Sequence, residues 1–464
     1  MASSLTSWLR RKATARSPAA PFHLVLTFYQ RDPAYALGLA CISAYVKREL
    51  AGVRVHLVPL FKGDDVARWV DEVLALAPDL VAVSAMHPTW LPAHPYLEAL
   101  RRAAPRTPFL VGGYQAMVSP AETLAHPAVD YVCAGDGEEP TVALIRRLRG
   151  ETDPDVPLPG LWERTAGGGV RTAEPVLVQD LRRMPFPDYT IFERAGQVRY
   201  LSPHAVESKR LTTLPVISGR GCPYRCTYCA NTTLLDMFGG KNGLLRKYEP
   251  EPLVDELVRL RDRYGVQYFQ FWDEEFLYER RYAARLLARY RERVGVPFSM
   301  FARVESMNDE LCGLAAAAGC HAMWFGMESG SEDYRRRYLN RRMTNAQILA
   351  GAESARRHGI KRFAFNMVGM PFETADDIRG TLALTRAIAP ELTVFSQYLP
   401  LPGTPLYELV RRHDLLLPPS ADRQMWPLGR LNVREHAPGV SAGEMRLLGD
   451  EIMGYLRAHT ACDD

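Results

Sequence analysis

Two blocks in which short apolar runs alternate with amphipathic segments constrain the fold of this chain more than any other feature. In the first block, residues 22–150, apolar runs such as 22–28 (FHLVLTF) and 80–86 (LVAVSAM) are separated by helix-like patterns such as 37–50. Unbroken apolar runs are typical of strands buried on both faces, and intervening helices favour parallel strands. The first block therefore predicts an α/β domain with a doubly wound parallel sheet.

The second block, residues 211–410, repeats the alternation with six apolar runs, from 213–219 (TLPVISG) to 392–402 (LTVFSQYLPLP). Six strands with helices between them predict a partial (β/α)6 TIM-type barrel, since a complete barrel has eight repeats. In such barrels the chemical groups lie at the carboxyl ends of the strands.

The remaining segments lack this alternation. Residues 1–21 are rich in Ser, Ala and Arg without acids, which predicts a disordered tail, with an organelle transit peptide as the alternative. Residues 151–210 are rich in Pro and Gly and are interpreted as a linker, with a small hairpin around 161–172. Residues 411–464 predict a C-terminal helical extension that either caps the barrel or supplies a wall for the substrate.

Charge and cysteine content exclude several classes of protein. The net charge of +4 over 464 residues, with dispersed Lys and Arg, does not indicate a nucleic-acid partner. No run approaches the roughly 20 apolar residues of a membrane span, so no membrane is expected. Three of the eight cysteines are clustered and five are scattered, which argues against a secreted disulfide framework and favours a reducing cytoplasm. The scattered ones are Cys41, Cys133, Cys312, Cys320 and Cys462.

The clustered cysteines are Cys222, Cys226 and Cys229, in the stretch GRGCPYRCTYC directly after the first apolar run of the second block. Thiolates select zinc, copper(I) or iron–sulfur clusters. A zinc site needs a fourth ligand, yet the next Cys or His is Cys312, on a predicted helix. A redox disulfide between Cys226 and Cys229 leaves Cys222 unexplained. The remaining interpretation is a [4Fe-4S] cluster with three cysteine ligands and one iron open to a small molecule.

The array also carries Gly221, Pro223 and Tyr228, and with these flanks it resembles the radical S-adenosylmethionine (SAM) superfamily. The resemblance implies that the three cysteines bind the cluster and that the amino and carboxylate groups of SAM chelate the open iron. It further implies that reductive cleavage of SAM yields a 5′-deoxyadenosyl radical, which abstracts hydrogen from a substrate. The cofactors then supply the chemistry and the barrel orients them.

Three acids end the next predicted strand in the stretch FWDEEF, residues 271–276. By the resemblance, Asp273 and Glu274, and less so Glu275, hold the methionine amino group of SAM. The alternative is an acidic helix N-terminus that stabilises the following helix through its dipole.

Later strand ends add further candidates for SAM binding. Glu328, in GMESGS, resembles the family's glutamate that reaches the ribose or methionine portion, with a solvated turn as the alternative. Arg303, in MFARVES, could clamp a carboxylate or form a structural ion pair. NMVGMPFET resembles the family's fifth-strand segment beside adenine, which implies that Gly369 permits close approach and that the backbone of Met370 reads the adenine edge. The stretch YLPLPGTPLYE (398–408) resembles the sixth-strand region of members with an N-terminal cobalamin domain.

The order of sheet domain, linker and barrel resembles the cobalamin-dependent radical SAM enzymes over nearly the whole chain. The resemblance implies that cobalamin lies at the carboxyl ends of the first sheet's strands, where doubly wound sheets bind ligands. A glycine pair there lets the backbone approach a ligand where a Cβ would intrude. The matching residues are Ser84, Gly112, Gly113, Gly135 and Glu138.

One mark of cobalamin domains is missing. The Asp-x-His-x-x-Gly loop, whose His replaces the lower axial ligand of cobalt, is replaced by PLFKGDD at 59–65. Cobalamin is then held without a protein His, or with His56 or His87 as axial ligand. The other alternative is a vestigial sheet that only braces the barrel.

The leading hypothesis is a cobalamin-dependent radical SAM methyltransferase that methylates an unactivated carbon of a small-molecule substrate with methylcobalamin. It would receive electrons from an external donor such as flavodoxin or ferredoxin. Alternatives are a non-methylating cyclisation, rearrangement or oxidation with the same cofactors, and a non-catalytic metal or redox module. No docking signature or phosphate loop indicates the substrate, and a barrel fold does not imply one.

Overall fold

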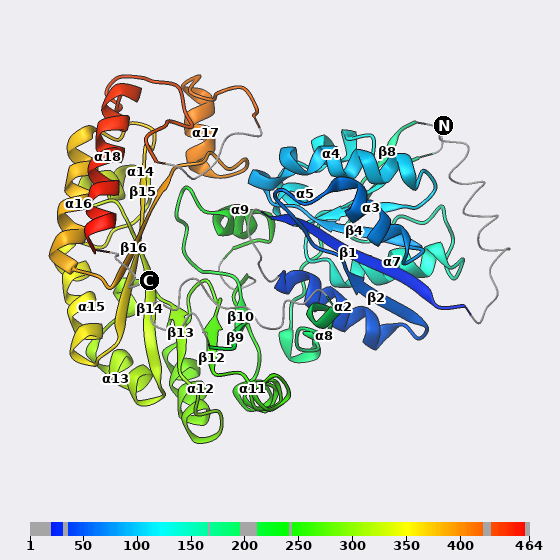
Figure 1. The fold of residues 1–464 in the computed structure, drawn as a ribbon, viewed down its shortest axis with the longest axis horizontal. Helices are drawn as coiled ribbons and strands as arrows, with labels where there is room; N and C mark the ends of the chain where they lie inside the picture. Colours follow the sequence, from blue (N-terminus) through cyan, green and yellow to red (C-terminus); the bar gives the residue numbers. More distant parts are fainter. Residues whose placement is uncertain are drawn as a thin grey trace. The chain divides into compact units, whose positions relative to one another are not determined.

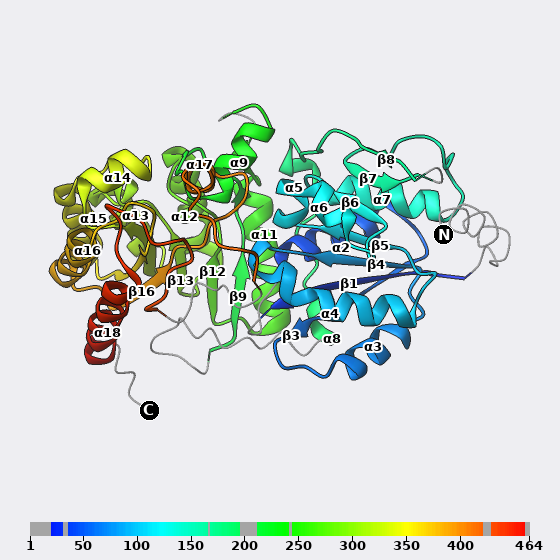
Figure 2. The same ribbon diagram turned by 90° about the horizontal axis from the view of Figure 1, so that it is seen from above.

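The structure is a computed structural model that describes residues 20–30, 36–165, 168–194, 211–240, 244–420 and 428–459. The chain divides into two compact units, Met1–Val198 and Arg199–Asp464, which are described one at a time (Figures 1 and 2). Residues 1–19 of the predicted tail, and Cys462, lie outside the described residues. No helix in the described ranges is long and apolar enough to cross a membrane.

The first unit is built on a sheet whose parallel strands follow the order β2-β1-β4-β5-β6. Because β1 lies between β2 and β4, the winding direction reverses between β1 and β4, which is the topological switch point of the sheet. The predicted doubly wound fold is therefore confirmed. The strands are β1 (Phe22–Gln30), β2 (Val53–Leu57), β4 (Leu80–Ser84), β5 (Phe109–Gly112) and β6 (Tyr131–Cys133), and the short β3 (Leu60–Phe61) pairs with the end of β1.

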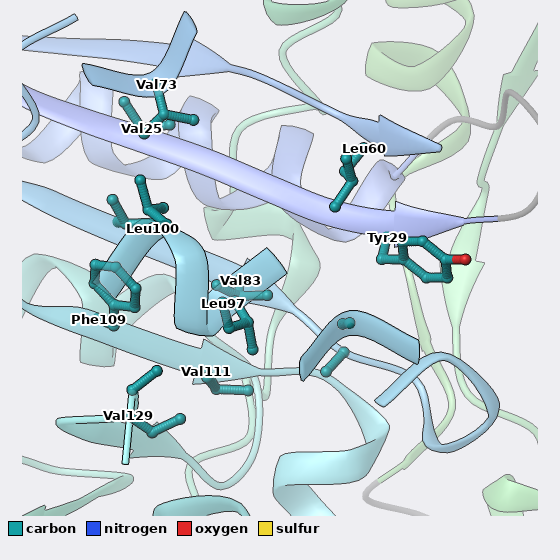
Figure 3. Packing of buried hydrophobic residues seen from close by; sticks show 14 of the residues in the cluster. Val25, Tyr29, Leu60, Val73, Val83, Leu97, Leu100, Phe109, Val111 and Val129 are labelled. Carbon is teal, nitrogen blue, oxygen red and sulfur yellow. The ribbon is translucent and has the colours of Figure 1, made fainter. Parts of the chain in front are cut away.

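Helices cover the strands of this sheet, which explains why the strands are apolar without interruption. Side chains of α3 (Val66–Leu74) and α4 (His87–Ala103), such as Val73, Leu97 and Leu100, pack on Val25, Val81 and Phe109 of the strands (Figure 3). A second pair, α2 (Leu37–Glu49) and α7 (Glu138–Leu148), packs together, and the short α5 (Tyr114–Val118) and α6 (Pro120–Ala125) follow β5. The core of the first unit therefore lies between α3, α4 and the strands.

The predicted hairpin in the linker is present as β7 (Leu161–Arg164) and β8 (Val170–Arg171), but it is not free of the first unit. β7 pairs with β6 in antiparallel fashion and extends the sheet. Farther along, Asp188 accepts hydrogen bonds from Ser43 Oγ at 2.6 Å and Lys47 Nζ at 2.5 Å on α2. The segment up to the short α8 (Thr190–Arg194) is thus anchored to the first unit, after the 3-10 turn Leu181–Arg183.

The second unit contains six parallel strands that pair in sequence order, which confirms the predicted partial barrel. The strands are β9 (Thr213–Val216), β12 (Tyr268–Phe271), β13 (Phe298–Phe301), β14 (Cys320–Glu328), β15 (Lys361–Val368) and β16 (Leu392–Gln397). Between them run α11 (Pro250–Tyr264), α12 (Arg280–Arg293), α13 (Asp309–Ala317), α15 (Asn345–Arg357) and α16 (Ala375–Ile388). All six strands therefore point their carboxyl ends to one edge.

Within the described residues after β16, the helices are α17 (Pro405–Arg412), which begins before the predicted start of the extension at residue 411, and α18 (Ala442–His459). α18 packs on α16, and its Leu448 and Ile452 share an apolar cluster with Val368 of β15 and Phe395 of β16 (Figure 1). α18 therefore braces the outer helical layer of the barrel beside its last two strands.

Candidate active site

The cysteine loop lies at the carboxyl end of β9, where barrel chemistry is expected. The chain leaves β9 through the short strand β10 (Gly219–Arg220), which pairs with β11 (Arg246–Lys247), and α9 (Ala230–Met237) begins directly after Cys229. Gly221 has φ +89°, and a Cβ there would lie 2.1 Å from Leu244 O. Only glycine fits this position, so Gly221 sets the path of the chain into the loop.

A buried ion pair fixes the start of this loop. Asp273, which is 1% exposed, accepts from Ser218 N at 2.8 Å, Ser218 Oγ at 2.5 Å and Lys247 Nζ at 2.9 Å. Both carboxylate oxygens are thus engaged by the protein itself. In this structure Asp273 holds the loop in place, and its contact with SAM stays a prediction.

The two neighbouring acids differ in exposure. Glu275 is 1% exposed and accepts from Arg303 N at 2.5 Å and Leu277 N at 3.1 Å, and burial raises its pKa to about 7. Glu274 is exposed and accepts from Gly221 N at 3.1 Å. Of the three adjacent acids, Glu274 is therefore the accessible one, and its role toward SAM stays a prediction.

The three thiols of the loop are not in disulfides: Cys226 is buried, and Cys222 and Cys229 are partly exposed. Burial raises the pKa of Cys222 to about 12 and that of Cys229 to about 11. Metal binding must therefore displace protons from these thiols. No three Cys, His, Asp or Glu side chains of the described residues converge on a single ion. A cluster requires no such convergence because each of its thiolates binds a different iron, so this donor set fits a three-cysteine cluster.

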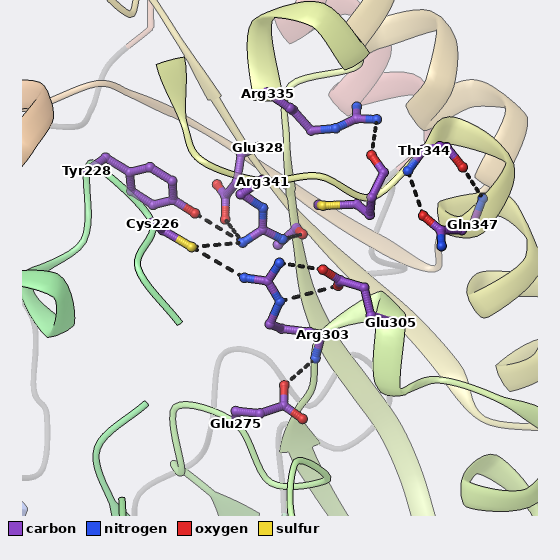
Figure 4. A network of polar contacts seen from close by, with 12 residues as sticks. Cys226, Tyr228, Glu275, Arg303, Glu305, Glu328, Arg335, Arg341, Thr344 and Gln347 are labelled. Carbon is purple, nitrogen blue, oxygen red and sulfur yellow. Dashed lines mark hydrogen bonds and ion pairs between the residues drawn. The ribbon is translucent and has the colours of Figure 1, made fainter. Parts of the chain in front are cut away.

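Cys226 differs from the other two thiols because two guanidinium groups contact it (Figure 4). Arg303 Nη1 lies 3.3 Å and Arg341 Nη1 3.7 Å from its Sγ. Arg341 also donates to Tyr228 Oη at 3.3 Å and Gly326 O at 2.5 Å, and it is 4% exposed. Sequence reasoning missed Arg341, which lies after α14 (Glu332–Tyr338) in the arginine-rich stretch 335–342. No letter in that stretch distinguishes its two buried arginines, Arg335 and Arg341, from the exposed ones.

Arg303 makes the structural ion pair that was one of its two expected roles. Its Nη2 and Nε donate to Glu305 at 2.5 and 3.3 Å, and its Cζ lies 3.9 Å from the centre of the Tyr224 ring. Its guanidinium is therefore engaged on several sides, and a clamp on a SAM carboxylate stays a prediction.

Glu328 ends β14 in a conformation that a non-glycine residue seldom adopts, with φ +69°. The residue is only 9% exposed, so the solvated-turn alternative is wrong. Burial raises the pKa of its carboxyl, and its Oε1 lies 4.0 Å from Arg341 Nη1. Strained residues of this kind concentrate at functional sites, which supports a ligand role for Glu328.

The turn after β15 is closed by hydrogen bonds between the backbone of Met370 and Glu373. Met370 N donates to Glu373 Oε2 at 3.1 Å, and Met370 O accepts from Glu373 N at 3.2 Å. Glu373 is fully buried, and burial raises the pKa of its carboxyl well above the usual value. Gly369 has φ +71°, which explains the glycine without a ligand. Contacts of Gly369 and Met370 with adenine stay predictions.

In the first unit a narrow cavity opens at the carboxyl ends of β1 and β4, at the switch point of the sheet. Its lining is mostly apolar and includes Tyr29, Leu60, Ser84, Thr89 and Tyr96. Doubly wound sheets bind ligands in this position. The space inside it is about that of one water molecule, so the cavity marks the switch point but does not admit part of a large cofactor in this structure. Ser84 lies at this edge, at the end of β4, as the sequence predicted.

Two of the three glycines predicted at the carboxyl edge of the first sheet lie against the backbone of the protein. A Cβ at Gly113, where φ is +88°, would lie 2.6 Å from Ala85 O, and one at Gly135 would lie 2.2 Å from Val176 O. Gly112 pairs with Ser84 in register, and a Cβ there would meet only Cys133 Cβ at 3.7 Å. The close approach at Gly113 and Gly135 is therefore to the protein backbone, and contact of these glycines with cobalamin stays a prediction.

The other candidates of the first unit also have structural roles. Glu138 starts α7 and is 2% exposed. His87 begins α4 with its Nδ1 2.7 Å from Gln115 Oε1, and the His56 ring stacks on His23 at 5.4 Å between centroids. Ligation of cobalamin by Glu138, His56 or His87 stays a prediction.

Comparison with known proteins agrees with the division of the chain into a sheet domain and a barrel. Residues 216–385 match the radical SAM superfamily and residues 29–145 match the B12 binding domain. A methyltransferase of Pyrococcus horikoshii described as uncharacterized is 24% identical over 82% of this chain and 79% of its own length. The cytidylyl-2-hydroxyethylphosphonate methyltransferase of Streptomyces wedmorensis is 24% identical over 73% of this chain and 69% of its own length.

Two solved structures share the fold. The radical SAM methyltransferase TsrM from Kitasatospora setae, with cobalamin and a [4Fe-4S] cluster bound, gives a TM-score of 0.66 at 22% identity and covers 84% of this chain and 75% of its own. The cobalamin-dependent radical SAM enzyme OxsB gives 0.72 at 17% identity and covers 94% of this chain and 67% of its own.

The two domain matches define a radical SAM protein that also carries a B12 binding domain. The chain thus combines the two domains that mark the cobalamin-dependent radical SAM enzymes, as the resemblance predicted. The cofactors of this family are a [4Fe-4S] cluster, SAM and cobalamin.

Proposed function

We propose that this protein is a methyltransferase that methylates an unactivated carbon of a small-molecule substrate. The observation that carries the proposal is the three-cysteine loop at the carboxyl edge of a parallel barrel, in a chain that also carries a B12 binding domain. Two relatives named as methyltransferases support methyl transfer in particular. When bound, SAM at the cluster supplies a 5′-deoxyadenosyl radical that takes a hydrogen atom, and methylcobalamin supplies the methyl group.

The residues of this chain bind and orient those groups. We assign the cluster to Cys222, Cys226 and Cys229, whose loop is held by Asp273 and Lys247. Glu274 and Glu328 are assigned to the amino and ribose groups of SAM, because one is accessible and the other is strained and buried at a strand end. Arg303, Gly369 and Met370 complete the SAM site as the resemblance implies. Cobalamin is assigned to Ser84, Gly112, Gly113, Gly135 and Glu138.

The proposal includes an external one-electron donor such as flavodoxin or ferredoxin, because reductive cleavage of SAM consumes an electron that the described residues do not supply. It also places the protein in the cytoplasm. Thiols that remain free of disulfides support a reducing compartment.

Labelled SAM tests the proposal without knowledge of the substrate. Protein reconstituted anaerobically with iron, sulfide and hydroxocobalamin is reduced with titanium(III) citrate and incubated with SAM that carries a trideuterated methyl group. We expect 5′-deoxyadenosine and trideuteromethyl cobalamin in the mass spectrum, and Cys226→Ala should lose the 5′-deoxyadenosine. If the protein holds both the cluster and cobalamin and the cobalamin carries no labelled methyl group, methyl transfer is contradicted.

A second candidate is a radical reaction without methyl transfer. Two relatives, from Cereibacter sphaeroides and Rubrivivax gelatinosus, are named anaerobic magnesium-protoporphyrin IX monomethyl ester cyclases, at 24% and 23% identity. This chain covers 55% and 59% of their lengths. In the same experiment this candidate predicts 5′-deoxyadenosine without labelled methylcobalamin.

A further inference from the structure

We propose that Arg341 is a positioning residue that balances the charge of the Cys226 thiolate and thereby raises the midpoint reduction potential of the cluster. Arg303 contributes in the same direction but less. The inference rests on the proposed cluster site, and it concerns the electron affinity of the cluster rather than the reaction that follows.

The first step is the asymmetry of the three cysteines. Cys226 Sγ is contacted by Arg303 Nη1 and Arg341 Nη1. Among the described residues, no arginine makes such a contact with the Sγ of Cys222 or Cys229. One corner of the cluster is therefore bonded to a thiolate in a cationic environment.

The second step is the charge balance of the two arginines. Arg303 is neutralised by Glu305 at 2.5 Å. Arg341 is 4% exposed, and the nearest carboxylate oxygen that contacts it, Glu328 Oε1, lies 4.0 Å away. Its Nε is also without a hydrogen-bond partner in the described ranges. A buried charge without a close partner is costly, so Arg341 requires an anion, and the Cys226 thiolate supplies it.

The third step is that the chain holds Arg341 against the cysteine loop. Thr227 N donates to Leu339 O at 3.3 Å, and Asn340 Nδ2 donates to Arg225 O at 2.8 Å. Thr227 Oγ donates to Tyr338 O as well. The segment before Arg341 is thus joined to the residues on both sides of Cys226, so the contact is built into the fold.

The consequence follows from electrostatics. Reduction adds an electron to the cluster, and a nearby positive charge stabilises the reduced state more than the oxidised state. Hydrogen bonds to the cysteine sulfurs act in the same direction. Because the charge of Arg341 is less neutralised than that of Arg303, its removal should lower the potential more.

A redox titration of the cluster, followed by electron paramagnetic resonance in the absence of SAM, tests the inference. The set is wild type, Arg341→Gln, Arg341→Lys and Arg303→Gln. Arg225→Gln is the matched control, because it removes the same charge beside Cys226 from an exposed guanidinium that pairs with Asp236 at 2.5 Å. Iron content is measured for every variant.

At the wild-type midpoint, we expect the ratio of reduced to oxidised cluster to fall roughly tenfold or more in Arg341→Gln. This ratio should fall less in Arg303→Gln, and in Arg341→Lys part of the loss should be recovered because the charge is kept. In Arg225→Gln the ratio should equal that of wild type. A wild-type potential in Arg341→Gln with full iron content would overturn the inference and leave the proposed function intact.

Loss of iron needs a separate decision. If Arg341→Gln takes up no cluster, Arg341→Lys decides: a potential below that of wild type supports the inference, and a wild-type potential overturns it. Failure of the wild-type protein itself to bind iron would overturn the proposed function instead. The two claims therefore fail in distinguishable ways.

Discussion

Arg303 Nη1 lies 3.3 Å from Cys226 Sγ, although the two residues are 77 positions apart in the sequence. The contact exists because Cys226 follows β9 and Arg303 follows β13, and parallel strands bring their carboxyl ends to one edge. Arg341 reaches the same sulfur from beyond β14. The candidate site is therefore a product of the barrel topology, with the cysteine loop at its centre.

Alanine at Cys222, Cys226 or Cys229 should reduce the iron bound after anaerobic reconstitution, because each thiolate holds one corner of the cluster. We expect the [4Fe-4S] absorption and the 5′-deoxyadenosine product to be lost in all three variants. Cys312→Ala, which removes a buried thiol from α13 of the same unit, is the control and should keep both. Full iron content and SAM cleavage in any variant of the triad would refute the ligand assignment.

Asp273→Asn should destabilise the second unit by about 3–5 kcal/mol, because it leaves the buried ammonium of Lys247 without its partner. The side chains of the pair are 8% and 2% exposed. Iron uptake should fall too, since Asp273 also holds Ser218 ahead of the cysteine loop. Urea denaturation of the full chain and iron analysis measure the two effects.

Two comparisons calibrate that result. The double variant Lys247→Met/Asp273→Asn should be more stable than Asp273→Asn, because it removes both charges. Arg285→Gln, which breaks an exposed pair with Glu251, should cost far less than Asp273→Asn, because solvent screens exposed ion pairs. Equal costs for Asp273→Asn and Arg285→Gln would show that the buried pair does not stabilise the unit.

Glycine substitutions separate backbone packing from cofactor contact in the first unit. Gly113→Ala should cost about 2–3 kcal/mol because its Cβ would press on Ala85 O. Gly63→Ala, also at positive φ but with no atom within 4 Å, should cost only about 1 kcal/mol. Gly112→Ala should leave stability nearly unchanged and weaken cobalamin binding, measured by absorption titration with hydroxocobalamin. Unweakened binding would remove Gly112 from the cobalamin site.

The first unit should lose stability on acidification through His126. Burial lowers the pKa of His126 to about 4, and its ring packs 4.3 Å from His94 with Glu98 Oε1 3.7 Å from its Nε2. Because the unfolded chain binds the proton first, stability present above about pH 6.5 is lost as the pH falls toward 4, by about 2 kcal/mol at pH 5. Urea denaturation should therefore show wild type and His126→Gln closer in stability at pH 5 than at pH 7. A constant difference would contradict the prediction.

The sequence predicted what depends on local pattern. Unbroken apolar runs predicted both parallel sheets, and the spacing of Cys222, Cys226 and Cys229 predicted the position of the site. The sequence could not predict that Arg341 contacts Cys226 or that Lys247 pairs with Asp273, because long-range packing brings these residues together. It also could not rank Asp273, Glu274 and Glu275, whose exposure depends on how the chain turns after β12. The tight approach of Gly113 to Ala85 likewise arises only when β4 and β5 pair.

The central claim is a cluster with three cysteine ligands and one iron that binds SAM. Mössbauer spectroscopy of protein reconstituted with ⁵⁷Fe, before and after addition of SAM, tests it most directly. We predict a [4Fe-4S] cluster in which one of the four irons changes its isomer shift when SAM is added, while the other three do not. Four irons whose spectra are unaltered by saturating SAM would contradict the account.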